Sequence, residues 1–293
     1  MSNNRNNTLA QRVLCLGIRT SCLGTSMLDE EETEKVLADN QAKKGSLRVQ
    51  RTRLKNAIAP FRQLRGEINR WYRGISLPGI SNDLRLIPSS RLEAIREKFQ
   101  TFVDRDVELL RKLRDNYEKE IEADQVLLGE RFDRSLYPDK DDLGQAFSLA
   151  LQVTDLPSGD FERLANLTAA DRARLKAEHD AMVTQMGVAA RTEVVSKLTA
   201  LITKVAEKLS DPDAEVYRES TLTNLKEYLA EVPSLNVTND PTIAAMATAA
   251  QERLNFTMAE LKKSQFMKEQ AANAAKEILA NFGALGSTRK MVA

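Results

Sequence analysis

The residue types that most often do chemistry are scarce in this chain and poorly spaced for catalysis. It has one histidine, His179, and two cysteines, Cys15 and Cys22. His179 lies in "KAEHDAM", on the apolar side of a helical pattern, where a packed structural histidine is commoner than a general base. Cys15 and Cys22 are seven positions apart, so a strand would turn them to opposite faces. We interpret both as small buried apolar side chains, and one histidine with two such cysteines does not make a zinc site of the usual kind.

The remaining polar groups also lack the spacing that a reaction needs. "GIRTSCLGTS" contains glycines but not the lysine of a phosphate-binding loop. The acidic run "DEEETE" could bind a cation but is interpreted as a solvated turn, and the stretch 29–41 could open a short helix. The Asp and Glu pairs on the helical patterns are interpreted as solvated or i,i+4 partners. No nucleophile is paired with a base, and no dinucleotide fingerprint occurs. We therefore expect a protein that is not an enzyme and that uses no metal or cofactor.

One segment carries far more positive charge than the rest of the chain. Between Lys43 and Arg73 there are ten basic residues and one acidic residue, Glu67, whereas the whole chain has a net charge of +1. If one regular helix continues across Pro60, six of the ten fall within about 60° of one another around its axis. These six candidate contact residues are Lys44, Arg48, Arg51, Lys55, Arg62 and Arg73. They could contact nucleic-acid phosphates, or pair with acidic surfaces of neighbouring helices or of a second subunit, and we favour the pairing.

The composition is typical of long, charged helices. Charged residues make up 29% of the 293 and aromatic residues 5%, with only 12 glycines and 8 prolines. A pI near 7.7 argues against a basic coat on nucleic acid. Two cysteines favour a reducing compartment, and neither a long apolar run nor a signal-peptide pattern is present. We expect a cytoplasmic protein, or one carried in a particle assembled in the cytoplasm, with no membrane contact.

Apolar periodicity predicts the helices. A first helix is expected from Ser46 to Tyr72, then a loop over 73–90, and a helix from about Ser90 to Leu128. Thr168 and Asp171 form a capping pattern for a helix that reaches Leu209. Asp-Pro pairs at 211–212 and 240–241 begin two more helices, the second running to Phe282 with Gly283 after its end.

Two short stretches alternate with a period of two and predict strands. One covers about 12–20 and the other 146–154, and we expect them to pair with each other. The fold class is therefore mainly α, with long antiparallel helical hairpins in a coiled-coil-like bundle and a small β element of two or a few strands. Three segments are expected: an N-terminal arm and strand (1–42), a helical hairpin with the β element (43–167) and long C-terminal helices (168–293).

The middle of the chain resembles a protein family of unknown activity. "RWYRGISLPGISNDLRLIPSSRLEAI" and "ERFDRSLYPDKDDLGQAFSLALQVTDLPSGDF" are similar to segments of an uncharacterised family of phage and proteobacterial helical proteins. The resemblance covers about Arg12 to Phe161. Members of that family are often encoded near a MoxR-type AAA+ ATPase and a von Willebrand A-type protein. The resemblance implies a phage origin, an assembly or adaptor role in the host cell cytoplasm, and an AAA+ ATPase as a partner.

Long apolar seams with few aromatic side chains favour self-association. Seams on helices of nearly 40 residues are fully buried only against neighbours of similar length, some of which would belong to other subunits. We expect a non-enzymatic helical protein that forms homo-oligomers and acts as an assembly component or adaptor. The alternative is a nucleic-acid-binding protein that uses the basic segment.

Overall fold

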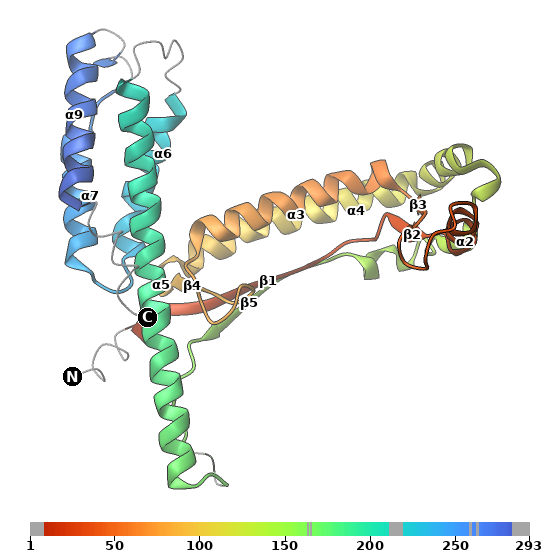
Figure 1. The fold of residues 1–293 in the computed structure, drawn as a ribbon, viewed down its shortest axis with the longest axis horizontal. Coiled ribbons are helices and arrows are strands. Elements are labelled where there is room, and N and C mark those ends of the chain that lie inside the picture. The colour runs from red at the N-terminus through yellow and green to blue at the C-terminus, as the bar shows by residue number, and fades with distance from the viewer. Residues whose placement is uncertain are drawn as a thin grey trace. The chain divides into compact units, whose positions relative to one another are not determined.

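The computed structural model describes residues 9–162, 164, 166–210, 219–257, 260–261 and 264–282, and within them the protein is mainly α-helical. The α-helices are α2 (Glu30–Asp39), α3 (Lys55–Ile75), α4 (Leu92–Leu128), α5 (Ala169–Ser210), α6 (Glu219–Leu235), α7 (Pro241–Arg253) and α9 (Gln265–Phe282). The strands are β1 (Val13–Ser21), β2 (Ser26–Leu28), β3 (Gln50–Thr52), β4 (Arg85–Pro88) and β5 (Ser148–Asp155). One sheet has the order β4-β1-β5, and β2 pairs with β3 in a second (Figure 1). The predicted fold class is confirmed.

Two compact units divide the chain, and each is built from separate stretches of sequence. Unit 1 consists of Met1–Leu16, Ser76–Leu92 and Val153–Ala293, and unit 2 of Gly17–Ile75 and Glu93–Gln152. The chain therefore passes from one unit to the other four times. These interleaved stretches differ from the three consecutive segments predicted from the sequence, and that division into segments stays a prediction.

Unit 1 is a helical bundle around the C-terminal part of α5. Helices α6, α7 and α9 pack with α5 and with one another (Figure 1). The first fully buried side chain of α5 is Val183, and its apolar seam then continues to Leu209. Small buried side chains such as Ala250 and Ala275 let α7 and α9 come close. The core of this bundle also takes in Val13 and Cys15 of β1 and Leu86 of β4.

The capping signals in unit 1 work as predicted where the structure describes them. The Thr168 hydroxyl accepts from Asp171 N at 3.1 Å, and the Asp171 carboxylate accepts from Thr168 N at 3.3 Å. Asp240 Oδ1 accepts from Thr242 N at 2.8 Å, which caps α7 with Pro241 at its first position. The predicted cap at 211–212 and the predicted end at Gly283 lie outside the described residues.

The prediction of one C-terminal helix from 240 to Phe282 is wrong. Helix α7 ends at Arg253, and α9 begins only at Gln265. Thr257 and Glu260 between them exchange capping hydrogen bonds of the kind that open a new helix, since Glu260 Oε2 accepts from Thr257 N at 2.7 Å. A continuous apolar pattern at helical spacing hid this break.

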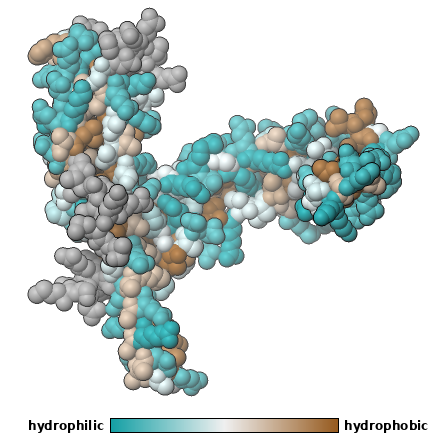
Figure 2. All heavy atoms as spheres, viewed as in Figure 1, coloured by the Kyte–Doolittle hydropathy of each residue, from teal (hydrophilic) through white to brown (hydrophobic). Residues whose placement is uncertain are grey.

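Unit 2 is a two-helix hairpin with strands along it. Helices α3 and α4 lie side by side (Figure 1), and Leu64, Ile68 and Phe102 form a buried cluster between them. A second cluster includes the rings of Phe61 and Phe147, whose centroids are 4.4 Å apart. The helices bury one stripe each and expose charged residues elsewhere, as Figure 2 shows on the visible face.

The predicted pairing of the two alternating stretches is confirmed. Strands β1 and β5 are neighbours in the three-stranded sheet, and the Ser21 hydroxyl at the end of β1 donates to Ser148 Oγ at the start of β5 at 2.8 Å. Strand β4 was missed, because Pro and Gly signals in 73–90 favoured a loop. In the structure Val13 of β1 lies opposite Pro88 of β4, and Leu16 opposite Arg85.

The prediction of a helix from Ser46 to Tyr72 is wrong in its first part. Residues 50–52 form β3, antiparallel to β2, and α3 begins at Lys55. Leu54 between the two elements has a left-handed backbone, with φ of 48°. The helix then continues through Pro60, which removes only the hydrogen bond to the carbonyl of Asn56.

Candidate interaction surface

The six basic residues proposed from the sequence lie on different elements rather than on one helical face. Lys44 and Arg48 precede β3, Arg51 lies within β3, and Lys55, Arg62 and Arg73 belong to α3. The stripe depended on a helix that starts before residue 50, and the β2–β3 pair takes that place. Only the part of the stripe on α3 is preserved as a surface.

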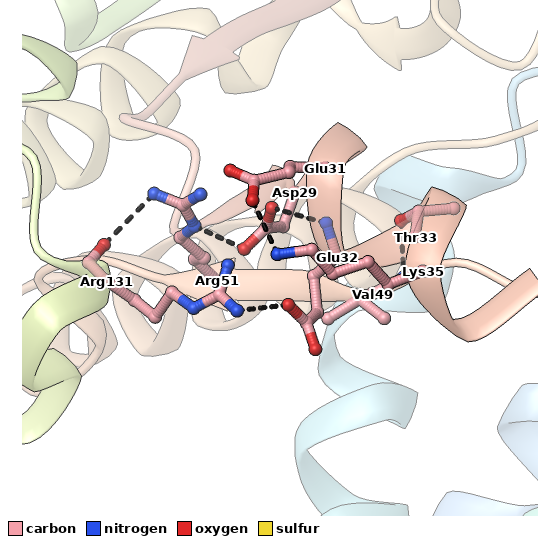
Figure 3. Close-up of polar contacts among 8 residues, drawn as sticks. All are labelled: Asp29, Glu31, Glu32, Thr33, Lys35, Val49, Arg51 and Arg131. Atoms are coloured by element: carbon pink, nitrogen blue, oxygen red, sulfur yellow. Dashed lines mark hydrogen bonds and ion pairs between the residues drawn. The ribbon is translucent and has the colours of Figure 1, made fainter. Parts of the chain in front are cut away.

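Arg51 is bound inside unit 2 and is not a free contact residue. Its Nε donates to Asp29 Oδ2 at 2.6 Å, and Asp29 is only 3% exposed. Its Nη1 donates to the main-chain carbonyl of Arg131 at 3.0 Å, and the Arg131 side chain pairs with Glu32 (Figure 3). These bonds connect α2, β3 and the segment after α4, so the role of Arg51 is structural.

Asp29 is the centre of this polar cluster because it accepts hydrogen bonds from both α2 and β3. Its Oδ1 accepts from Glu32 N at 3.1 Å and so caps α2. Its main-chain N–H donates to the carbonyl of Val49 at 2.9 Å, and Val49 N donates to Thr33 Oγ1 at 2.9 Å. The hydrogen bond from Arg51, with that from Glu32 N, lowers the pKa of Asp29 from its usual 3.8 to about 2.

Other cations of the basic segment are also bound within unit 2. Arg65 donates to both carboxylate oxygens of Asp106, at 2.6 and 3.0 Å. Glu67, the one acidic residue of the segment, accepts two bonds of 2.8 Å from Arg105. Arg53 donates to main-chain carbonyls, including that of Gly24 at 3.0 Å. Pairing with acidic neighbours, the interpretation favoured from the sequence, therefore applies to Arg51 and Arg65 within one chain.

The exposed face of α3 is what remains of the basic segment. At about 100° per residue, Lys55, Arg62 and Arg73 fall within roughly 20° of one another, and Arg70 lies about 60° away. All four are exposed, and no exposed residue of α3 is acidic. Arg62 also donates to the Thr25 hydroxyl. These four residues, here called the α3 basic face, form a one-sign surface along the helix.

Sequence reasoning missed a buried polar network in unit 2. Asp124 Oδ2 accepts from Leu54 N at 2.5 Å and from the Tyr137 hydroxyl at 2.9 Å. Burial, and then the bond to Asp124, raise the pKa of Tyr137. The signal was Asp124 itself, an acid in the apolar register of Tyr117 and Ile121. The network holds the left-handed turn at Leu54 that begins α3, which is a structural task.

His179 binds a loop to α5, as a structural histidine would. Its Nε2 donates to the carbonyl of Pro157 at 2.8 Å, and the Phe161 ring meets it edge-on with centroids 6.2 Å apart. Of the two cysteines, Cys15 is buried and Cys22 half-buried, and neither is in a disulfide. Burial raises the pKa of the Cys15 thiol.

The described residues offer neither a metal-binding cluster nor a membrane-spanning helix. In the part of the chain that the structure describes, no group of three or more His, Cys, Asp or Glu side chains could hold a metal ion. Within the same residues no helix has the length and apolar character needed to cross a bilayer.

No family model, curated protein or solved structure matches the chain. The resemblance to the phage and proteobacterial family therefore stays a prediction.

Proposed function

We propose that this is a non-enzymatic helical protein that self-associates and acts as an assembly component or adaptor. One observation carries the proposal. Residues 169–182 of α5 contain no buried side chain, although the helix continues without interruption to Ser210. This part of the helix is roughly 21 Å long at about 1.5 Å per residue.

A helical segment of this length gains little stability in water without packing against something. Isolated helices shorter than about 12–15 residues are marginal. Within unit 1 the loop that His179 binds covers part of this segment, Met182 packs against the edge of the bundle core, and Leu175 and Met182 are both only half-buried. Helix packing from a second copy would complete the burial of these side chains.

Substituting the half-buried seam tests the proposal. Light scattering at tens of micromolar should give a mass above that of one chain for the wild type, and a lower mass for a Leu175→Glu and Met182→Glu variant. Two exposed residues of the same helix, Thr184 and Gln185, serve as controls when changed to Glu. A strictly monomeric wild type would overturn the proposal.

The biological setting follows only from the resemblance. It supports a phage-encoded protein in the host cytoplasm, with an AAA+ ATPase as partner. Co-purification of the chain with an ATPase encoded beside it would test this part directly, and its absence from the purified complex at low salt would count against the adaptor role.

A second candidate function is nucleic-acid binding, and the α3 basic face favours it. Four exposed cations could neutralise phosphates, and the carboxylate of Glu67, which lies near Arg70, is already bound by Arg105. Binding of this kind weakens steeply with salt, with a log–log slope of about −0.9 per neutralised phosphate on duplex DNA. A gel-shift series at increasing salt measures that slope.

A further inference from the structure

Basic and acidic surface residues of unit 2 lie on different helices. The α3 basic face carries Lys55, Arg62, Arg70 and Arg73, all exposed. The exposed residues of α2 are mostly acidic instead: Glu30, Glu34 and Glu31 fall within about 100° of one another around the helix, whereas Asp39 lies opposite Glu30. Lys35 is the only exposed cation among the residues of α2, and it pairs with Glu31 at 2.5 Å. The exposed charged residues of α2 are therefore mostly acidic, and those of α3 are basic.

Most of these charged side chains make no hydrogen bond or ion pair within unit 2. Asp29, the cap of α2, forms an ion pair with Arg51, and Glu32 forms one with Arg131. Both acids face the inside of the unit. Among the described residues, Glu30 and Glu34 make no hydrogen bond or ion pair, and the same holds for Lys55, Arg70 and Arg73. Two surfaces of opposite sign thus stay available on the same chain.

The acidic side of α2 is shorter than the α3 basic face and can meet part of it. Helix α2 has ten residues and spans about 15 Å, of which Glu30 to Glu34 account for about 6 Å. Arg62 and Arg73 are eleven residues apart, which puts their Cα atoms about 16 Å apart along α3. Between them this side of α3 presents Gly66 and Asn69, small or short side chains that would let another helix approach.

We propose that the acidic side of α2 in one copy docks on the α3 basic face of a second copy. The inference rests on the proposed self-association and names the surface that serves it. The contact is either reciprocal, with α2 of each copy on α3 of the other in a two-fold pair, or head-to-tail, which leaves each copy one free surface for the next neighbour. Repetition of the head-to-tail contact gives a ring or a filament.

A second copy explains the charges better than a nucleic acid does. The whole chain has a net charge of only +1, so the acids that balance the basic segment lie elsewhere on the same molecule. A phosphate backbone would be attracted by the α3 basic face and repelled by α2 in the same unit. A copy of the chain meets each surface with its complement.

Charge exchange tests the proposal. The α2 variant carries Glu30→Lys and Glu34→Lys, and the α3 variant carries Arg70→Glu and Arg73→Glu. Each alone should place like charges across the contact and raise the dissociation constant at least about tenfold. The chain with all four changes should recover the mass of the wild type in light scattering, because the signs are exchanged on both sides. Circular dichroism confirms that each variant keeps its helices.

A matched control separates this contact from a general effect of charge. Arg96→Glu with Lys119→Glu changes the net charge as the α3 variant does, at two exposed residues of α4 that make no polar contact with the described residues. This control should leave the mass unchanged. Both surfaces should also lose affinity as salt is raised, since the contact is between exposed charges.

Four results decide between the alternatives. Loss in each single-surface variant with recovery in the four-fold variant supports the contact. An oligomer that survives both variants overturns it, while the proposed self-association stands. A monomeric wild type overturns both. Unchanged mass in the α3 variant together with loss of binding to a 30-base-pair duplex overturns the contact in favour of nucleic acid.

Discussion

At the scale of single residues, Gly159 shows how closely the loop before α5 fits its histidine. Gly159 has φ of 66°, and a Cβ at this position would overlap Nδ1 of His179. Gly129 has a similar φ of 55°, with nothing within 4 Å of a Cβ. Both glycines therefore have a left-handed backbone, but only Gly159 has a side chain, that of His179, in the place of a Cβ.

Replacing each glycine by alanine should separate strain from overlap. Gly129→Ala should lower the free energy of unfolding by about 1 kcal/mol, which is the penalty of a left-handed backbone. Gly159→Ala should lose more than that, by a further 1 kcal/mol or so, because the loop must move away from His179. Urea titration measures both. Equal losses in the free energy of unfolding would mean that the loop before α5 moves away from His179 at no cost.

Asp29 gives the polar cluster a defined dependence on pH. Its pKa is about 2 in the folded protein, below the usual 3.8. A carboxyl whose folded pKa is lowered stabilises the fold above its unfolded pKa, and this contribution is lost as the pH falls. The stability gained from Asp29 should therefore be intact above about pH 4 and disappear on acidification toward about pH 2.

The comparison of wild type with Asp29→Asn measures this dependence. The difference between their thermal midpoints should shrink as the pH is lowered from 5 to 2.5, because the wild type loses the charge that the variant never had. An Arg51→Gln variant should show the same loss of pH dependence, since Arg51 is the main cause of the low pKa. A difference that stays constant over this range would contradict the assignment.

Individual charges were the least predictable part of the candidate surface. The sequence shows ten cations in one segment but not that Asp29 lies within 2.6 Å of Arg51, 22 positions away, or that Asp106 meets Arg65. Such pairs depend on tertiary contacts that no local pattern encodes. What could be predicted was the direction: a nearly neutral chain must hold acids somewhere to meet those cations.

At the scale of elements, β5 is covered less than its alternating pattern suggests. Leu149, Leu151 and Val153 share one side of the strand, and all three are half-buried. Leu86 of β4, in contrast, is fully buried in the core of unit 1. The period of two therefore predicts the strand β5 but does not measure its burial.

Placing a carboxylate on each strand should show this difference. Leu86→Asp should lower the free energy of unfolding by about 4 kcal/mol or more, because the charge has no partner in an apolar core. Leu151→Asp should lose only about 1–2 kcal/mol, since water still reaches the side chain. Guanidinium titration of both variants gives the values. Equal losses would mean that β5 is buried as deeply as β4.

Long periodic elements were predictable and short ones were not. Helices α4 and α5 follow apolar seams and begin near the expected residues, and β1 and β5 follow alternating patterns. Strand β3 has three residues and β4 four, too short to show a period. Their positions are set by partner strands, which is why a helix was predicted through β3 and a loop through β4.

At the scale of the whole molecule, the interleaved units predict how a fragment of the chain should fold. Among the described residues, the range 168–293 contains α5, α6, α7 and α9 of the bundle, and the sequence suggested this range as a segment of its own. In the structure their core also needs Val13, Cys15 and Leu86, which come from earlier in the chain.

The fragment 168–293 expressed alone should therefore lack the cooperative melting of the full chain. Removal of these three buried side chains opens apolar surface on the bundle, and each large loss of this type is worth about 2–5 kcal/mol. Circular dichroism during heating compares the fragment with the full-length protein. A sharp transition at the same temperature in the fragment would show that the strands contribute little to the bundle.

The order of the strands in the sheet has a consequence for synthesis on the ribosome. Strand β1 is made first, yet Ser148 of its partner β5 follows Ser21 by 127 residues. At about 5–20 residues per second, translation leaves β1 without β5 for roughly 6–25 seconds. Strand β4, which also pairs with β1, is made before β5, so for the rest of that time the β5 edge of "VLCLGI" stays open in the nascent chain, the kind of edge that aggregates or binds a chaperone. Slow translation between the two strands should lower the soluble yield, and a trigger-factor-type holdase should restore it.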